Sequence, residues 1–364
     1  MKGVCIMVED INKILVKLKE MDASKLVHYD VKQEDTTLQD YFRKRSSIMG
    51  TQKTIDELSP WERMCCYRVS DNQQFDCDTA LFSTVVYHLA YGLRENGWVI
   101  RKYSEKNSKF QLVTLQKELL LRGDTMNSYA TSVHSFIRKL WIPREGNKNR
   151  MMEAGILDKN GNVNSKFERN YWEDAILSHY DYFQNVLPDS AHAYIQLNHT
   201  IGNLIPVPFI GENKGQFNSP RGLGKSRDYW DLALLAIYKH YHPACSSFTY
   251  MKEPLQWLLG SASNADLCRN WLESFANWDT FVEHNFLQDF VNQQDGQYGL
   301  PKELWAGHFQ QNIPVLPEKE KDFDQLFTNA SAWITARGQR IAGKIYEVLE
   351  GRDLEALAEE MAGP

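Results

Sequence analysis

The chain has 364 residues, of which 43% are hydrophobic and 24% are charged, the balance of a soluble globular protein. Its formal net charge of −6 argues against a surface that coats nucleic acid throughout, although a local basic groove stays compatible with it. Because a single core usually stops growing at about 250–300 residues, we expect more than one subdomain.

Cysteine usage and apolar runs indicate the compartment. The six cysteines form no C-x-x-C pair, and no histidine spacing turns them into a zinc site. No run reaches the ~18 apolar residues of a membrane-spanning helix, and the N-terminus becomes amphipathic before any apolar signal segment. The sequence therefore predicts a cytoplasmic protein with no membrane partner.

Helical periodicity dominates the first part of the chain. An apolar face at helical spacing is formed by Ile11, Ile14, Leu15 and Leu18. A capping box, Ser59-Pro60-Trp61-Glu62, predicts the start of another helix. Further helices are expected over residues 78–94, 108–123 and 124–141.

The character of the sequence changes near residues 145–165, which are polar and carry the turn signal Asn160-Gly161. Helices return over 167–187 and, with Ser226 as a plausible cap, over 226–242. The predicted fold is mainly α: a multi-helix protein with a small irregular or β-containing, ββα-like insert in the middle. The predicted regions are 1–145, 146–245 with the insert, and 246–364.

The stretch "LNHTIGNLIPVPFIGENKGQF", residues 197–217, reads as neither an ordinary helix nor an ordinary loop. Pro206 and Pro208 prevent a helix and disfavour a central strand, but an edge ribbon over 203–207 is compatible with them. Polar residues on such irregular backbone usually bond to the backbone or to a ligand.

Within this stretch, "IGNLIPVPFIGENKGQF" followed by "GLGKSRDYW" is similar to a family pattern: Ile/Leu-Gly-Asn-Leu, then Asn, Phe and Lys. The pattern resembles the C-terminal HNH-type nuclease domain of GmrSD-like modification-dependent restriction enzymes. The longer segment over about 195–240 also resembles a group of bacterial proteins without an assigned function. The resemblance implies metal-dependent hydrolysis of a phosphodiester, plausibly in bacterial defence against foreign DNA.

The resemblance also implies roles for individual residues. Gly202 and Asn203 match the turn, Asn213 matches the later Asn, and Lys225 matches the terminal Lys. The family's upstream acid-His-apolar-x-Pro element, which supplies the general base, has no counterpart here. His199 is the alternative base, and it then requires a second carboxylate or histidine brought close by the fold.

Structural roles remain open for the same residues. His199 could cap the turn, Asn203 and Asn213 could bond loop carbonyls, and Lys225 could lie at an exposed helix lip. Arg221 and Arg227 join Lys225 at a predicted helix N-terminus, where they would contact a substrate phosphate or only solvent. A degenerate nuclease fold retained for binding is a third possibility.

Two classes of function follow. The first is a nucleic-acid-acting protein, with DNA preferred over RNA, using His199, Asn213 and Lys225 with Mg²⁺ or Mn²⁺. The second is a non-catalytic helical interaction protein without a cofactor, whose aromatic-rich C-terminal half holds a protein partner. The ten Trp and seventeen Tyr suit interfaces as well as cores, so composition does not separate the two.

Overall fold

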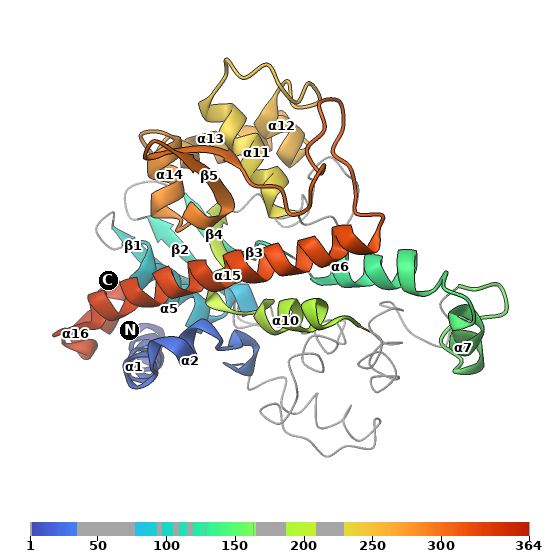
Figure 1. Cartoon of the computed structure of the whole chain (residues 1–364). Coiled ribbons are helices and arrows are strands. Elements are labelled where there is room, and N and C mark those ends of the chain that lie inside the picture. The colour runs from blue at the N-terminus through green and yellow to red at the C-terminus, as the bar shows by residue number, and fades with distance from the viewer. Residues whose placement is uncertain are drawn as a thin grey trace.

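In the computed structural model, most of the described residues form helices, which pack around a small antiparallel sheet (Figure 1). The described residues are 2–34, 77–92, 97–104, 109–114, 119–127, 129–162, 164, 187–208 and 229–363. The mainly α fold class is confirmed for them. The capping box at 59–62, the helix expected at 167–187 and the cap Ser226 lie outside them.

The helices are distributed along the whole described chain. The α-helices are α1 (Lys2–Glu20), α2 (Ala23–Val27), α5 (Leu81–Ala90), α6 (Tyr129–Phe136), α7 (Asn147–Glu153), α10 (Asp189–Leu197), α11 (Trp230–Tyr241), α12 (Pro254–Leu259), α13 (Ala262–Leu272), α14 (Trp278–His284), α15 (Glu320–Leu349) and α16 (Leu354–Ala362). Short 3-10 turns are η1 (Val31–Glu34), η3 (Cys77–Thr79), η5 (Ile201–Asn203) and η6 (Gln288–Phe290), and a π-helical turn, η4 (Ile137–Trp141), continues α6. No described helix is long and apolar enough to span a bilayer.

Several expected helices are confirmed with their apolar faces inward. In α1, Ile11, Leu15 and Leu18 are fully buried, as their spacing predicts. Helix α11 ends at Tyr241, directly before His242 and Pro243, because proline disfavours helical backbone in the residue that precedes it. Both helices therefore follow from local sequence alone.

The main sheet has the order β1-β2-β3-β4, and every neighbouring pair is antiparallel. Its strands are β1 (Trp98–Ser104), β2 (Lys109–Thr114), β3 (Leu120–Thr125) and β4 (Leu204–Pro208). A separate hairpin pairs β5 (Val291–Gln294) with β6 (Gln297–Pro301). Pro206 and Pro208 lie in β4, which is the last strand of the described sheet, so the segment forms the edge ribbon that the two prolines allow.

The helix expected over 108–123 is wrong, because this segment forms β2 and β3. Leu112 and Leu121 face each other across the two strands and are 1% and 2% exposed. Such a cross-strand pair buries both side chains in a way that spacing along one segment does not reveal. Most of the sheet therefore comes from the region expected to be helical, and only β4 comes from the middle of the chain.

The next expected helix also begins later than predicted. Asp124 and Thr125 end strand β3, and α6 begins only at Tyr129. A β-carbon on Gly123 would lie 1.7 Å from the carbonyl oxygen of Asp78, so this strand passes its neighbour at a distance that only glycine allows.

Helix α15 runs through the middle of the molecule (Figure 1). It contacts α2, α5, α10 and η5, and the helices α11 to α14 lie on its other side in this view. Helices α1 and α16 pack together, so both ends of the described chain lie near one another. The division at 145 and 245 stays a prediction, and α15 joins elements of all three predicted regions.

Candidate functional site

Three of the predicted site residues lie in the part of the chain that the structure describes: His199, Gly202 and Asn203. They follow one another between α10 and β4, all in a buried turn. The remaining predicted site residues are outside the described ranges; they are Asn213, Lys225, Arg221 and Arg227. The roles predicted for those four residues stay predictions.

His199 lies beside a carboxylate from the N-terminal part of the chain. Its imidazole Nδ1 is 3.8 Å from Oδ1 of Asp30, in the connection between α2 and η1. The two side chains are 5% and 7% exposed, and the His199 carbonyl accepts a hydrogen bond of 3.0 Å from the Val31 amide. The fold thus brings to His199 the carboxylate that a catalytic role requires, but in a buried setting. No local signal in the sequence points to Asp30.

Asn203 is fully buried, and its side chain bonds only to backbone. Its Nδ2 donates to the carbonyl oxygens of Asn127 and Asn198, at 2.9 and 2.8 Å. Its Oδ1 accepts from the Asn127 amide at 3.0 Å. Satisfying three backbone groups in this way fixes the turn between α10 and β4 against the end of β3.

Gly202 lies directly against the backbone of α15. A β-carbon here would be 2.0 Å from the carbonyl oxygen of Ile334. A β-carbon on Gly338 would in turn be 3.6 Å from the Gly202 Cα and 3.3 Å from a methyl group of Val27. The absence of side chains at both glycines allows the turn, α2 and α15 to approach this closely.

A buried arginine on α15 joins this turn to other parts of the molecule. The Arg337 side chain is 0% exposed, and its Nη1 donates to the carbonyl oxygens of Gly202 and Leu204, both at 2.8 Å. Its Nε donates to the Asn285 carbonyl at 3.0 Å, and its Nη2 donates to the hydroxyl of Tyr91. The fork of donors on one guanidinium therefore fixes three segments that are distant in sequence.

Burial shifts the pKa values of Arg337 and Tyr91 in opposite directions. It lowers the pKa of the Arg337 guanidinium from its ordinary value, although an arginine in a protein stays charged. It raises the pKa of the Tyr91 hydroxyl, an effect partly offset by Arg337. Tyr91 is therefore a neutral phenol whose oxygen accepts from a cation.

Sequence reasoning missed Arg337, although a signal exists. Arg337 lies three residues after Ile334 and four before Ile341, on the apolar face of a long amphipathic helix. A charged residue at such a position is buried only when its donors are satisfied. A lone arginine within an apolar stripe thus indicates a hydrogen-bonded hub.

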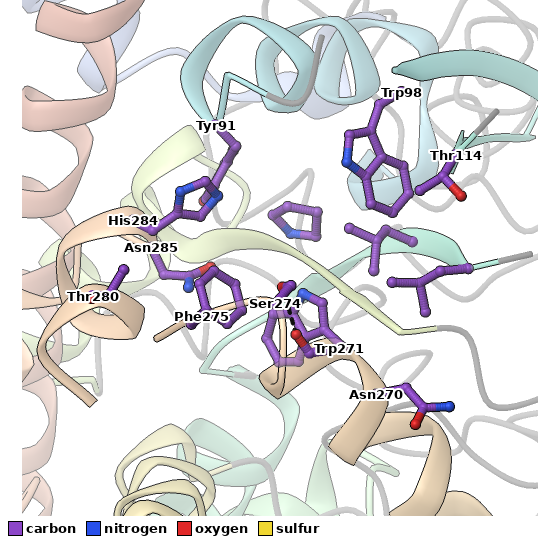
Figure 2. Close-up of a pocket in the computed structure, with 13 residues that line it drawn as sticks. Tyr91, Trp98, Thr114, Asn270, Trp271, Ser274, Phe275, Thr280, His284 and Asn285 are labelled. Carbon is purple, nitrogen blue, oxygen red and sulfur yellow. Dashed lines mark hydrogen bonds between the residues drawn. The ribbon is translucent and has the colours of Figure 1, made fainter. Parts of the chain in front are cut away.

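Tyr91 and Asn285 also line a cavity of about 330 Å³ between the main sheet and the helices α13 and α14 (Figure 2). One wall comes from the strands and the other from the α13–α14 segment. We call this space the aromatic cavity; its lining residues are Tyr91, Trp98, Thr114, Leu119, Leu121, Pro206, Asn270, Trp271, Ser274, Phe275, Thr280, His284 and Asn285.

Among the described residues, the lining combines aromatic rings with polar groups and carries no Asp, Glu, Lys or Arg. Burial lowers the pKa of His284, so its imidazole is neutral near pH 7. The side chains of His284 and Asn270 form no hydrogen bond to any other residue within the described ranges. Asn270 is exposed and His284 is half-buried, so water can reach both groups, and a ligand that displaces this water can bond to them.

The described residues contain no preformed metal site. They contain no group of three or more His, Cys, Asp or Glu side chains that could hold an ion. Mg²⁺ or Mn²⁺ therefore stays a prediction, attached to residues most of which lie outside the described ranges.

Comparison with known proteins gives one match. Residues 162–341 match the model of a family of unknown function (DUF6994), a span of slightly under half of the chain. The match includes the turn at 201–204, the α13–α14 wall of the aromatic cavity and Arg337. No curated protein and no solved structure shows a significant match.

Proposed function

We propose that this chain is a non-catalytic binding protein, and that the aromatic cavity holds an aromatic group of its partner. The observation that carries the proposal is the hydrogen bonding of Arg337. One buried guanidinium binds the turn at 201–204 and also Tyr91 and Asn285 in the cavity wall. In this proposal, the turn that resembles a nuclease motif holds Arg337 in place, and Arg337 in turn holds Tyr91 and Asn285 in the wall of the binding site.

The size and chemistry of the cavity support binding. Its volume of about 330 Å³ lies at the lower end of the roughly 300–1,000 Å³ typical of small-molecule sites. Large aromatic side chains beside a few unsatisfied polar groups are also typical of such sites. A ligand that fills the cavity displaces water from these groups, and each group that it leaves unpaired costs about 1–3 kcal/mol, so a ligand with matching polar atoms is favoured.

The environment of His199 supports a structural role for that residue. A general base must reach a water molecule or a substrate proton within hydrogen-bonding distance. The His199 side chain is 5% exposed and lies against Asp30, and its carbonyl anchors Val31. An imidazole in this buried position can stabilise the turn, but it is poorly placed to transfer a proton to a substrate in a surface groove.

The test is ¹⁹F NMR of protein labelled with 5-fluorotryptophan, with each signal assigned by a Trp→Phe variant. Indole is the probe, because it is a flat, uncharged aromatic ring. We expect the Trp98 and Trp271 signals to shift saturably, while the signal of Trp257, which lies off the cavity beside Tyr250, stays in place. Unchanged Trp98 and Trp271 signals at saturating indole would contradict the proposal.

A second candidate is the metal-dependent nuclease related to HNH enzymes, a cytoplasmic protein of bacterial defence acting on DNA. The Asp30–His199 pair favours it, because a carboxylate can orient an imidazole that acts as base. In this reading the insert is ββα-like, Asn213 and Lys225 complete the site, Arg221 and Arg227 contact phosphate, and Mg²⁺ or Mn²⁺ is the cofactor.

The nuclease reading is tested by incubating plasmid and single-stranded DNA with the protein and Mg²⁺ or Mn²⁺. His199→Gln and Asp30→Asn keep the size of each side chain and remove its chemistry. Metal-dependent cleavage that is lost in His199→Gln would establish the nuclease and overturn the non-catalytic proposal. If the protein only binds, no variant and no metal changes the substrate.

A further inference from the structure

We infer that the aromatic cavity accepts an uncharged, planar heteroaromatic ring of the nucleobase class. This inference rests on the proposed binding function and names the chemistry of the ligand. Three features of the lining carry it: the placement of the aromatic rings, the lack of formal charge, and the polar groups left without partners.

The aromatic side chains lie on different sides of the space. Figure 2 shows Trp98, from β1, across the cavity from Trp271 and Phe275, with Tyr91 and His284 along a third side. All five side chains line the same volume. Aromatic side chains on opposite sides of a cavity favour a flat ring, because such a ring can stack on them or meet them edge to face.

The lack of charge selects against ionic ligands. None of the lining residues that the structure describes is Asp, Glu, Lys or Arg, and the lowered pKa of His284 keeps its imidazole neutral. A phosphate, carboxylate or ammonium group inside would lose its water without gaining a counter-charge. The charged parts of a nucleotide must therefore stay outside the cavity, and only the base enters.

The polar groups select against a plain hydrocarbon ring. A neutral His284 offers one donor and one acceptor, and the Asn270 amide offers both. Neither side chain is satisfied by another described residue. A hydrocarbon that displaces the water around these groups leaves them unpaired, whereas the ring nitrogens and exocyclic groups of a base can pair with them, as an asparagine amide pairs with adenine.

The mouth of the cavity lies where its lining is exposed. Asn270, Ser274 and Thr280 are exposed lining residues, while Trp98, Trp271 and Phe275 are buried. A base would enter past the exposed residues and leave its sugar outside. A free nucleoside and an unpaired base of a single-stranded nucleic acid share this chemistry, and the experiment distinguishes them.

The experiment titrates the full chain with adenosine, guanosine, cytidine and uridine, and separately with short single-stranded oligonucleotides, at low and high salt. The readout is the ¹⁹F signals of Trp98 and Trp271. We expect at least one nucleoside to shift both signals saturably. Trp271→Ala should weaken binding about tenfold or more, because a stacked aromatic residue commonly contributes that much.

Two further variants control this experiment. Trp257→Ala removes a tryptophan that packs on Tyr250 outside the cavity, and it should leave the affinity unchanged. Asn270→Trp places bulk at the exposed mouth without removing a buried side chain, and it should abolish binding. Circular dichroism checks each variant for folding, and Asn270→Trp carries the test if Trp271→Ala does not fold.

Each outcome has a definite meaning. Equal affinity for nucleosides and oligonucleotides supports a free nucleoside as the ligand, whereas tighter, salt-sensitive oligonucleotide binding supports a single-stranded nucleic acid. Binding of indole without any nucleoside overturns the nucleobase inference, leaves the binding function standing, and points to an aromatic side chain of a protein partner. If neither indole nor any nucleoside binds, both proposals fall.

Discussion

The turn at 198–204 and the aromatic cavity are close neighbours that treat buried polar groups in opposite ways. In the turn, Asn203 has both side-chain atoms bonded to backbone, and the carbonyls of Gly202 and Leu204 accept from Arg337. In the cavity, His284 has no hydrogen-bond partner among the described residues. Satisfied polar groups hold a backbone in place, and unsatisfied ones beside open space are available to a ligand.

Arg337 donates hydrogen bonds to residues of both regions, so changes on either side of it can separate stability from binding. If the turn serves stability and the cavity serves binding, variants in the turn should mainly lower the free energy of unfolding. Variants of the cavity mouth should cost binding with little loss of stability. The predictions that follow are arranged from the largest expected effect to the smallest.

Replacing Arg337 with Met should have the largest effect on stability. The variant keeps much of the side-chain length but removes the donor of five hydrogen bonds, to four backbone carbonyls and the Tyr91 hydroxyl. We expect the free energy of unfolding in urea to fall by about 3–5 kcal/mol, as for the breaking of a buried charged network. Arg340→Met is the matched control; it removes only a surface ion pair with Asp289 and should cost less than about 1 kcal/mol.

Gly202→Ala should be the next most damaging change. Its β-carbon would lie 2.0 Å from the Ile334 carbonyl oxygen, so the turn or α15 must move. We expect a loss of about 3 kcal/mol in the same unfolding measurement. Gly343→Ala, also on α15, meets nothing within 4 Å and should raise stability by about 0.5–1 kcal/mol. Equal effects at the two glycines would contradict the close contact.

Tyr91→Phe removes one hydroxyl shared by the hub and the cavity wall. The guanidinium of Arg337 loses the acceptor for its Nη2, and a hydrogen bond to a charged group contributes about 1.5–3 kcal/mol. We expect a loss of about 2 kcal/mol by urea unfolding. Because the ring remains in the lining, saturating indole should still shift the ¹⁹F signals of Trp98 and Trp271.

His308 gives the smallest effect, one that depends on pH. The residue is fully buried and burial holds its pKa well below the ordinary value near 6.5, so the folded protein keeps it neutral. Below pH 6.5 the unfolded chain takes up a proton that the folded chain does not. Stability should therefore fall as the pH decreases, by up to about 1.4 kcal/mol per pH unit.

The measurement is urea unfolding between pH 7.5 and about 5.5. His308→Phe should flatten the dependence without abolishing it, because burial also lowers the pKa of His284. His28→Gln changes an exposed histidine and should leave the curve unchanged. A steep loss of stability that persists unaltered in His308→Phe would place its origin in another group.

The local parts of the fold could be predicted from sequence. The spacing of Ile11, Leu15 and Leu18 predicted α1, and Pro206 with Pro208 ruled out a helix and allowed an edge ribbon, because each depends on neighbours along the chain. The same reasoning gave the wrong structure for the segment 108–123, which forms strands and not a helix. Its leucines satisfy a helical pattern, while the partner that decides the matter, Leu121 across from Leu112, becomes a neighbour only in the folded sheet.

The candidate site shows the same limit. The turn stood out in the sequence through Gly202 and Asn203, but the residues that explain it come from elsewhere. Asp30 reaches His199, and Arg337 reaches the Gly202 carbonyl, although each pair is more than 100 residues apart in the sequence. No pattern within a short window contains such pairs, and only the misplaced charge on the apolar face of α15 hinted at one of them.

The position of α15 in the chain has a consequence for the order of folding during synthesis. The hydroxyl of Tyr346 on this helix donates to the carbonyl of Met21, 325 residues away in sequence. Elements made early, such as α2, α5 and α10, gain their central support only after the ribosome has released residues 320–349. Until then the surfaces that they present to α15 stay uncovered, and exposed apolar surface on a nascent chain favours aggregation.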